Sequence, residues 1–186
     1  VVRTDGLPIG LLDQNISSRP PISEEVRELK KRSHGIALPI EEKESIRWLE
    51  SYTKSNNHPE LKNVNVVTVC DREADMYDLF ELGISSNALF LVRASQNRMV
   101  NKESTYSKKT GERLWDPMNN LNCEGEIEVN IPDRDDKPKR TAVLEIRFSN
   151  FIMNPPANNV KKKIKKLPNL KLAAIYVMEK SAPVGE

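Results

Sequence analysis

The chain has 186 residues, of which 38% are hydrophobic and 30% are charged, and this size can bury one ordinary core with a smaller appended layer. No apolar run reaches the roughly 20 residues that cross a bilayer, so we expect no membrane partner. The 29 basic and 27 acidic residues give a net charge of +2, which decides little, because binding to a polyanion depends on how charges cluster.

The first elements in chain order are a turn, a long connection and a helix. Asp5-Gly6 favours a tight turn between two short apolar segments, so the chain is predicted to start with a β-hairpin. Residues 16–40 are rich in Ser, Pro and charge, which is typical of an irregular connection, with a short helix at 23–31. Residues 41–52 have the spacing of an amphipathic helix.

A strand, a helix and a second strand follow. The β-branched, apolar run at 64–70 predicts a strand buried on both faces, as in the centre of a parallel sheet. Helical spacing then continues after Asp71 until Gly83, which is predicted to close the helix. Residues 88–92 predict a second buried strand. The order strand, helix, strand implies a parallel pair joined by a crossover.

The second half of the chain predicts an antiparallel β layer. Residues 94–111 are polar and turn-like, and residues 113–119 favour a short helix. Alternating apolar and polar residues predict three strands with one solvated face, at 125–131, 141–148 and 170–178.

Asp71 stands directly after the predicted strand at 64–70, and therefore at the carboxyl edge of the predicted parallel pair, where open α/β sheets place ligands. One interpretation is that Asp71 caps a helix beginning near Glu73. The other is a metal ligand, since two-metal phosphoryl transfer needs carboxylates on rigid strand ends to hold Mg²⁺ or Mn²⁺. Spacing alone favours the cap, and one Asp cannot form a two-metal site.

The run Val69-Cys70-Asp71-Arg72-Glu73-Ala74-Asp75, with Leu79 and the later Phe90-Leu91-Val92-Arg93, resembles the segment around the second catalytic Asp of bacterial DDE transposases of the insertion-sequence-four type. Weaker matches follow in order along nearly the whole chain, at residues 10–14, 19–20, 42–45, 48–49 and 114–116. The resemblance implies an α/β fold with a ribonuclease-H-like mixed sheet and helices, interrupted by a β-rich insertion domain. It implies a partial catalytic core over residues 1–93 and an insertion domain, truncated at its end, over residues 94–186.

On this resemblance, Asp71 is the middle member of an Asp-Asp-Glu triad that binds two Mg²⁺ or Mn²⁺ ions. The chain opens without an initiator Met inside a predicted strand and stops within an unfinished element, so we interpret it as an internal piece with the other two carboxylates outside it. The isolated chain is then expected to be inactive. The parent enzyme is expected to cleave transposon-end DNA and to join the freed 3′-hydroxyl to target DNA, as a homodimer on DNA.

Two arginines and a basic segment are candidate DNA contacts. By resemblance, Arg93 meets transposon-end DNA and Arg98 matches a basic residue of the following loop, whereas Ser95 departs from the lysine of a close relative. Arg93 can equally be an ion-pair partner of Asp75 or Glu73. The segment 137–171 holds ten basic residues and one acid, which favours phosphate contacts or, alternatively, a solvated loop. Its candidate DNA contacts are Lys137, Lys139, Arg140, Lys161, Lys162 and Lys163.

Two further functions stay open. The chain can belong to a non-catalytic DNA-binding or assembly module with a degenerate ribonuclease-H-like fold, or to a related metal-dependent nuclease that cuts without strand transfer. Cys70 and Cys123 are far apart and outside any C-x-x-C pair, so neither a disulfide framework nor a zinc site is indicated. The chain shows no secretion leader, and we expect a bacterial cytoplasmic location.

Overall fold

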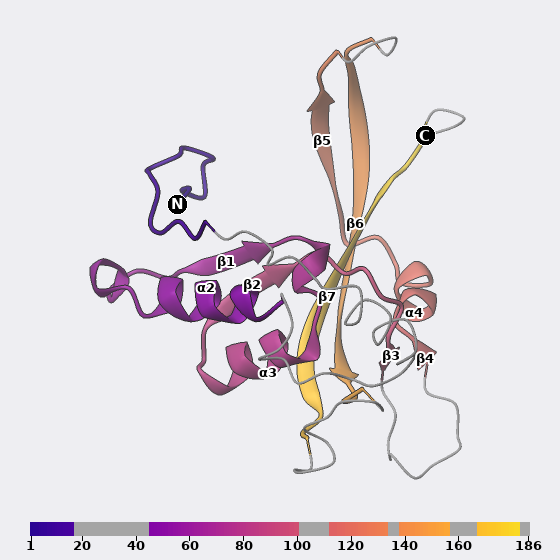
Figure 1. Cartoon of the computed structure of the whole chain (residues 1–186). Coiled ribbons are helices and arrows are strands. Elements are labelled where there is room, and N and C mark those ends of the chain that lie inside the picture. The colour runs from indigo at the N-terminus through magenta and orange to yellow at the C-terminus, as the bar shows by residue number, and fades with distance from the viewer. Residues whose placement is uncertain (17–44, 101–111, 134–137, 157–166, 183–186) are drawn as a thin grey trace, which may run out of the picture. The chain divides into compact units, whose positions relative to one another are not determined.

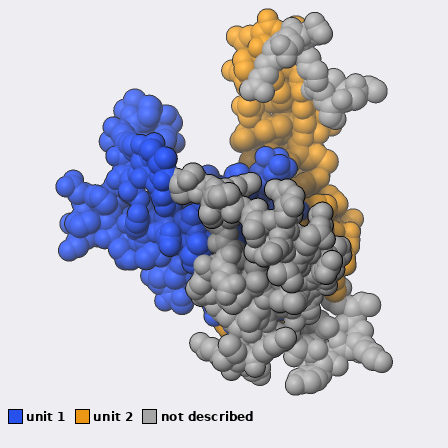
Figure 2. Space-filling view, in the orientation of Figure 1, with its two compact units in different colours: residues 1–95, 156–167 blue, residues 96–155, 168–186 orange. Residues whose placement is uncertain are grey.

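The computed structural model of the chain describes residues 1–16, 45–100, 112–133, 138–156 and 167–182 (Figure 1). The helix expected at 23–31 lies outside these residues. The architecture is mixed α/β, and the chain divides into two compact units. Unit 1 comprises Val1–Ser95 with Pro156–Leu167, and unit 2 comprises Gln96–Pro155 with Pro168–Glu186 (Figure 2). No helix in the described part of the chain is long and apolar enough to span a membrane.

The amino end forms the predicted turn, but one residue earlier than expected. The Gly6 amide donates to the carbonyl of Arg3 at 2.9 Å, so the central residues of the turn are Thr4 and Asp5. Gly6 follows them with a φ of 86°, a conformation that glycine adopts without a steric penalty. The predicted hairpin is reduced to a single antiparallel bridge between Val2 and Pro8.

The core of unit 1 is a parallel pair of strands packed on two helices. The strands β1 (Val67–Cys70) and β2 (Leu89–Val92) pair in parallel, which confirms the predicted pair. The Phe90 ring from β2 stacks on Phe80 with centroids 5.5 Å apart and meets Tyr52 edge-on at 6.4 Å. The other elements of the unit are α2 (Ile46–Asn56), α3 (Tyr77–Ser85) and the short 3-10 turns η2 (Pro59–Leu61) and η3 (Arg72–Ala74).

The prediction that the first strand is buried on both faces is wrong, and so is the prediction that the second strand is buried. Side chains alternate between the two faces of a strand, and only the face that carries Phe90 packs against α2 and α3. The opposite face consists of register partners that are half or more exposed: Val67 at 51%, Leu89 at 52%, Val69 at 71% and Leu91 at 50%. Apolar composition therefore predicted the strands correctly but not what covers them.

The sequence predicted that Gly83 closes the helix. This prediction is wrong, because α3 continues to Ser85. A Cβ atom at Gly83 would lie 2.4 Å from the Phe90 ring and 3.0 Å from the Tyr52 hydroxyl. Gly83 therefore allows the close approach of α3 to β2. The left-handed conformation that follows the helix belongs to Asn87, with a φ of 52°.

Tyr77, the first residue of α3, predicts how the stability of unit 1 depends on pH. It is 3% exposed, and burial, followed by the charges of Glu81 and Asp78, raises its pKa from 10.0 to about 12. The Tyr77 hydroxyl ionises at a lower pH in the unfolded chain than in the folded chain. Its contribution to the free energy of unfolding is therefore complete below pH 10 and is lost as the pH rises from 10 to about 12. The free energy of unfolding, measured with denaturant, should fall between pH 9 and pH 11. This fall should be about 1 kcal/mol smaller in Tyr77→Phe than in the unmodified chain. Equal falls in both proteins would contradict the burial of an un-ionised hydroxyl.

Unit 2 is an antiparallel sheet with one short helix. Its order is β4-β3-β6-β5, with β7 also pairing with β6. The three strands predicted from alternation are confirmed as β5 (Gly125–Ile131), β6 (Arg140–Met153) and β7 (Leu170–Glu179), although β6 runs further than expected. The predicted short helix is α4 (Trp115–Asn119). Two two-residue strands, β3 (Met99–Val100) and β4 (Glu112–Arg113), were not predicted, because so short a strand shows no alternation.

Candidate functional site

Asp71 is an exposed cap at the carboxyl end of β1. Its Oδ1 accepts a hydrogen bond from the amide of Glu73 at 2.9 Å, which begins the turn η3. The capping interpretation is therefore confirmed, for a 3-10 turn instead of an α-helix. The cap engages one carboxylate oxygen, and the side chain remains exposed, so capping and binding of a cation are compatible roles for this group.

Arg93 leaves the sheet beside Asp71. Cys70 and Val92 are register partners in the parallel pair, so Asp71 and Arg93 are the first residues after two adjacent strands. The Arg93 amide donates to the carbonyl of Cys70 at 3.0 Å, which extends the pairing by one residue. The two side chains that the sequence singled out in unit 1 therefore start from the same edge of the sheet.

The alternative role of Arg93 as an ion-pair partner is not what the structure shows. Glu73 pairs with Arg47 at 3.2 Å, and the Oδ2 of Asp75 accepts hydrogen bonds from Ser95. Within the described part of the chain, Arg93 forms no ion pair with either carboxylate, and its side chain is exposed. An exposed guanidinium at a sheet edge is available to a phosphate.

Asp75 is a residue whose importance the sequence did not reveal. It is 5% exposed, and its Oδ2 accepts from the Ser95 amide at 2.8 Å and from the Ser95 hydroxyl at 3.1 Å. The available signal was an acid between the apolar residues Ala74 and Met76. The sequence pattern by itself indicated for Asp75 no more than a possible ion pair with Arg93.

Asp71 is the candidate metal ligand at this edge. Burial, followed by the negative charge of Asp71, raises the pKa of the Cys70 thiol, so the thiol stays protonated at neutral pH and does not compete as a ligand. Asp71 supplies carboxylate oxygens, which Mg²⁺ and Mn²⁺ prefer. The residues present therefore fit one ligand of such an ion and not a whole site.

Three of the other candidate DNA contacts, Arg98, Lys139 and Arg140, are described residues of unit 2. Lys139 is exposed just before β6, whereas Arg140 forms a bidentate ion pair with Glu179. Arg98 belongs to unit 2, where its carbonyl accepts from the Leu114 amide at 2.9 Å. The remaining four candidates lie outside the described residues: Lys137, Lys161, Lys162 and Lys163.

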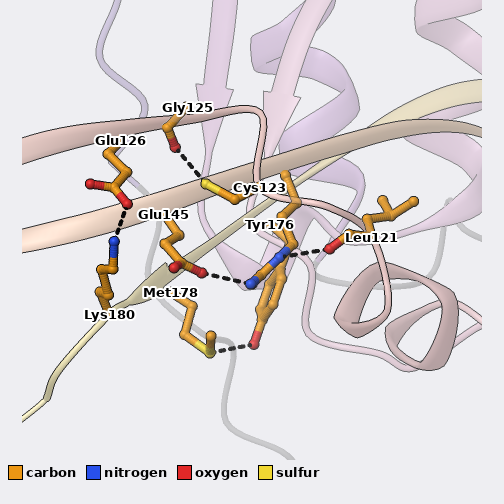
Figure 3. A network of polar contacts seen from close by, with 9 residues as sticks. Leu121, Cys123, Gly125, Glu126, Glu145, Tyr176, Met178 and Lys180 are labelled. Carbon is orange, nitrogen blue, oxygen red and sulfur yellow. Dashed lines mark hydrogen bonds and ion pairs between the residues drawn. The ribbon is translucent and has the colours of Figure 1, made fainter.

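A second cluster of ionisable groups lies at the start of β5. The ligand atoms of Cys123, Glu126 and Glu145 all lie within 4.8 Å of one another. The two carboxylates stand opposite each other in the register of β5 and β6, where like charges repel unless cations neutralise them. Lys180 pairs with Glu126 (Figure 3). Arg147 pairs with Glu145 at 2.6 Å. The positive charges of Lys180 and Arg147 therefore neutralise the two carboxylates of this cluster. Its third member, a thiol, is not a ligand that Mg²⁺ favours.

No known family model matches the chain. A functional assignment therefore depends on the residues themselves and on their placement in unit 1. That placement is the exposed Asp71 carboxylate and the exposed Arg93 guanidinium after adjacent parallel strands.

Proposed function

We propose that this chain is part of a DDE-type, cut-and-paste DNA transposase with a ribonuclease-H-like core. The observation that carries the proposal is the position of Asp71 at the carboxyl edge of a parallel pair, next to Arg93. Parallel sheets bind their ligands at this edge. The resemblance of the segment Val69–Arg93 to the transposase motif gives the edge its proposed chemistry.

In the proposed site, each group has one role. Asp71 ligates one or both of two Mg²⁺ or Mn²⁺ ions, together with an Asp and a Glu that the complete protein supplies. Such ions activate the attacking water or hydroxyl and stabilise the leaving oxygen. The amide of Glu73 orients the Asp71 carboxylate through the cap at 2.9 Å. Arg93 binds a backbone phosphate of the DNA and positions the strand without reading its bases.

The proposal also accounts for the exposed apolar face of β1 and β2. Parallel sheets in α/β proteins have both faces covered. Val67, Val69, Leu89 and Leu91 are each at least 50% exposed in this chain. In the proposed complete core, further elements of the ribonuclease-H-like fold cover these four side chains.

The test uses the complete protein, meaning this chain with its natural flanking sequence, and DNA that carries the ends of the element encoding it. With Mg²⁺ we expect strand cleavage that leaves a 3′-hydroxyl at the element end, followed by joining of that end to target DNA. Without a divalent ion, the same reaction should show DNA binding and no cleavage. Gel analysis of labelled strands measures DNA binding, strand cleavage and joining to target DNA.

Each alternative predicts a different product. Cleavage without any joined product would favour the related metal-dependent nuclease. Binding of end DNA without cleavage would favour the non-catalytic DNA-binding or assembly module. Failure to bind end DNA at all would overturn the proposal.

A further inference from the structure

The buried carboxylate of Asp75 connects the turn after β1 to the segment after β2. Its Oδ2 lies 2.8 Å from the amide nitrogen and 3.1 Å from the hydroxyl oxygen of Ser95. The same hydroxyl lies 3.4 Å from the carbonyl oxygen of Arg72. Ser95 therefore contacts both ends of η3, the turn that Asp71 caps. We refer to this as the Asp75–Ser95 contact.

The two hydrogen bonds of the Asp75–Ser95 contact are stronger than bonds between neutral groups because their acceptor is a buried carboxylate. A buried carboxylate is costly unless donors satisfy it, and hydrogen bonds to an ionised group are roughly twice as strong as those between neutral groups. Asp75 is 5% exposed, and it is the only charged side chain that is buried among the described residues. Replacing Asp75 should therefore free Ser95 more than the loss of the same hydrogen bonds to an exposed carboxylate would.

The contact limits where Arg93 can go. The Arg93 amide is bonded to the Cys70 carbonyl at 3.0 Å, and two residues later Ser95 is bonded to Asp75. The segment that leaves β2 is thus attached to the β1 side at two points. Its backbone cannot swing away from the edge where Asp71 stands unless one of these attachments breaks.

We propose that Asp75 is a positioning residue that, through Ser95, holds Arg93 beside Asp71 so that the DNA-binding guanidinium and the metal-binding carboxylate act at one edge. The assignment of DNA binding to Arg93 rests on the proposed function, whereas the contact itself rests on the hydrogen-bond distances within unit 1. Ser95 takes part through its backbone amide as well as its hydroxyl. Its role therefore does not require the lysine of the resembling family.

Amide hydrogen exchange in this chain tests the Asp75–Ser95 contact directly. Asp75→Ala should accelerate exchange of the Ser95 amide by more than about 10-fold, because the amide loses its acceptor. Asp75→Asn should restore much of the protection, since a carboxamide oxygen can accept both bonds. Ser95→Ala removes the hydroxyl and keeps the hydrogen bond from the backbone amide to Asp75. The amide of residue 95 should therefore exchange at a rate between those of the unmodified chain and Asp75→Ala. The matched control is Glu50→Ala, an exposed acid on α2, which should change nothing. Unchanged exchange in Asp75→Ala would overturn the contact.

Salt dependence in the complete protein tests the positioning. If Asp75 holds Arg93 on a phosphate, Asp75→Ala should reduce the slope of log affinity for end DNA against log salt by about 1, and Arg93→Ala should reduce it by the same amount. Adding Asp75→Ala to Arg93→Ala should cause no further reduction. General destabilisation would weaken binding without this change of slope, and that result would overturn the role of Asp75.

The two arms separate failure of this inference from failure of the proposed function. Slow Ser95 exchange in a protein that binds no end DNA would overturn the proposed function while the Asp75–Ser95 contact stands. Normal DNA cleavage with an unchanged salt slope in Asp75→Ala would overturn the positioning role while the proposed function stands.

Discussion

Asp71→Asn should lower Mg²⁺-dependent strand cleavage by the complete protein by more than about 100-fold, because even residues that only support a metal ligand cost 10- to 100-fold when they are replaced. The asparagine amide oxygen can still accept the hydrogen bond from Glu73 that Asp71 accepts at 2.9 Å. The turn η3 and the affinity for end DNA should therefore be preserved. Single-turnover cleavage and binding of labelled end DNA measure the two effects separately.

Two further variants separate metal binding from capping at Asp71. Asp71→Ala removes both the charge and the cap, and it should destabilise unit 1 by about 1 kcal/mol in addition to abolishing cleavage. Glu73→Gln changes the neighbouring exposed acid, whose ion pair with Arg47 has both side chains about half exposed, at 47% and 59%, so little stability should be lost. Retained cleavage in Asp71→Asn would show that Asp71 is only a cap and would refute its assignment as a metal ligand.

Gly83→Ala should destabilise this chain by about 1 to 2 kcal/mol, although alanine is the better helix former. The added Cβ would lie 2.4 Å from two atoms of the Phe90 ring, and that ring is held between Phe80 and Tyr52. Overpacking costs about 1 to 3 kcal/mol, and a Cβ 2.4 Å from a ring that is held on two sides belongs in the upper part of that range, at about 2 to 3 kcal/mol. Subtracting the gain in helix propensity of about 1 kcal/mol leaves about 1 to 2 kcal/mol. Urea unfolding of the purified chain measures the difference.

The controls for Gly83 use another glycine and the ring itself. Gly125→Ala introduces the same methyl group where no atom lies within 4 Å, so it should not lower stability. In a Phe90→Leu background, Gly83→Ala should cost less, because the smaller side chain can yield and the two positions are coupled. A Gly83→Ala protein as stable as the unmodified chain would mean that α3 does not approach β2 so closely.

The elements that the sequence predicted best are those with a long, regular pattern. The alternation in β5, β6 and β7 and the apolar runs of β1 and β2 placed all five strands to within a few residues, except for the extra length of β6. Spacing also placed Asp71 at a strand end. By contrast, β3 and β4 have two residues each, and no periodic signal exists at that length.

For the candidate site, the sequence pattern was enough to show that an acid follows β1 and that Arg93 follows the next strand. The three-dimensional arrangement was needed to show that Cys70 and Val92 are register partners, that Asp75 is buried and bonded to Ser95, and that Arg140 is paired with Glu179. It also decided that Val67 and Leu91 are exposed and that Gly83 serves packing against Phe90. The physical reason is that chain-local patterns specify backbone conformation, whereas burial and pairing depend on which distant residues arrive at the same place.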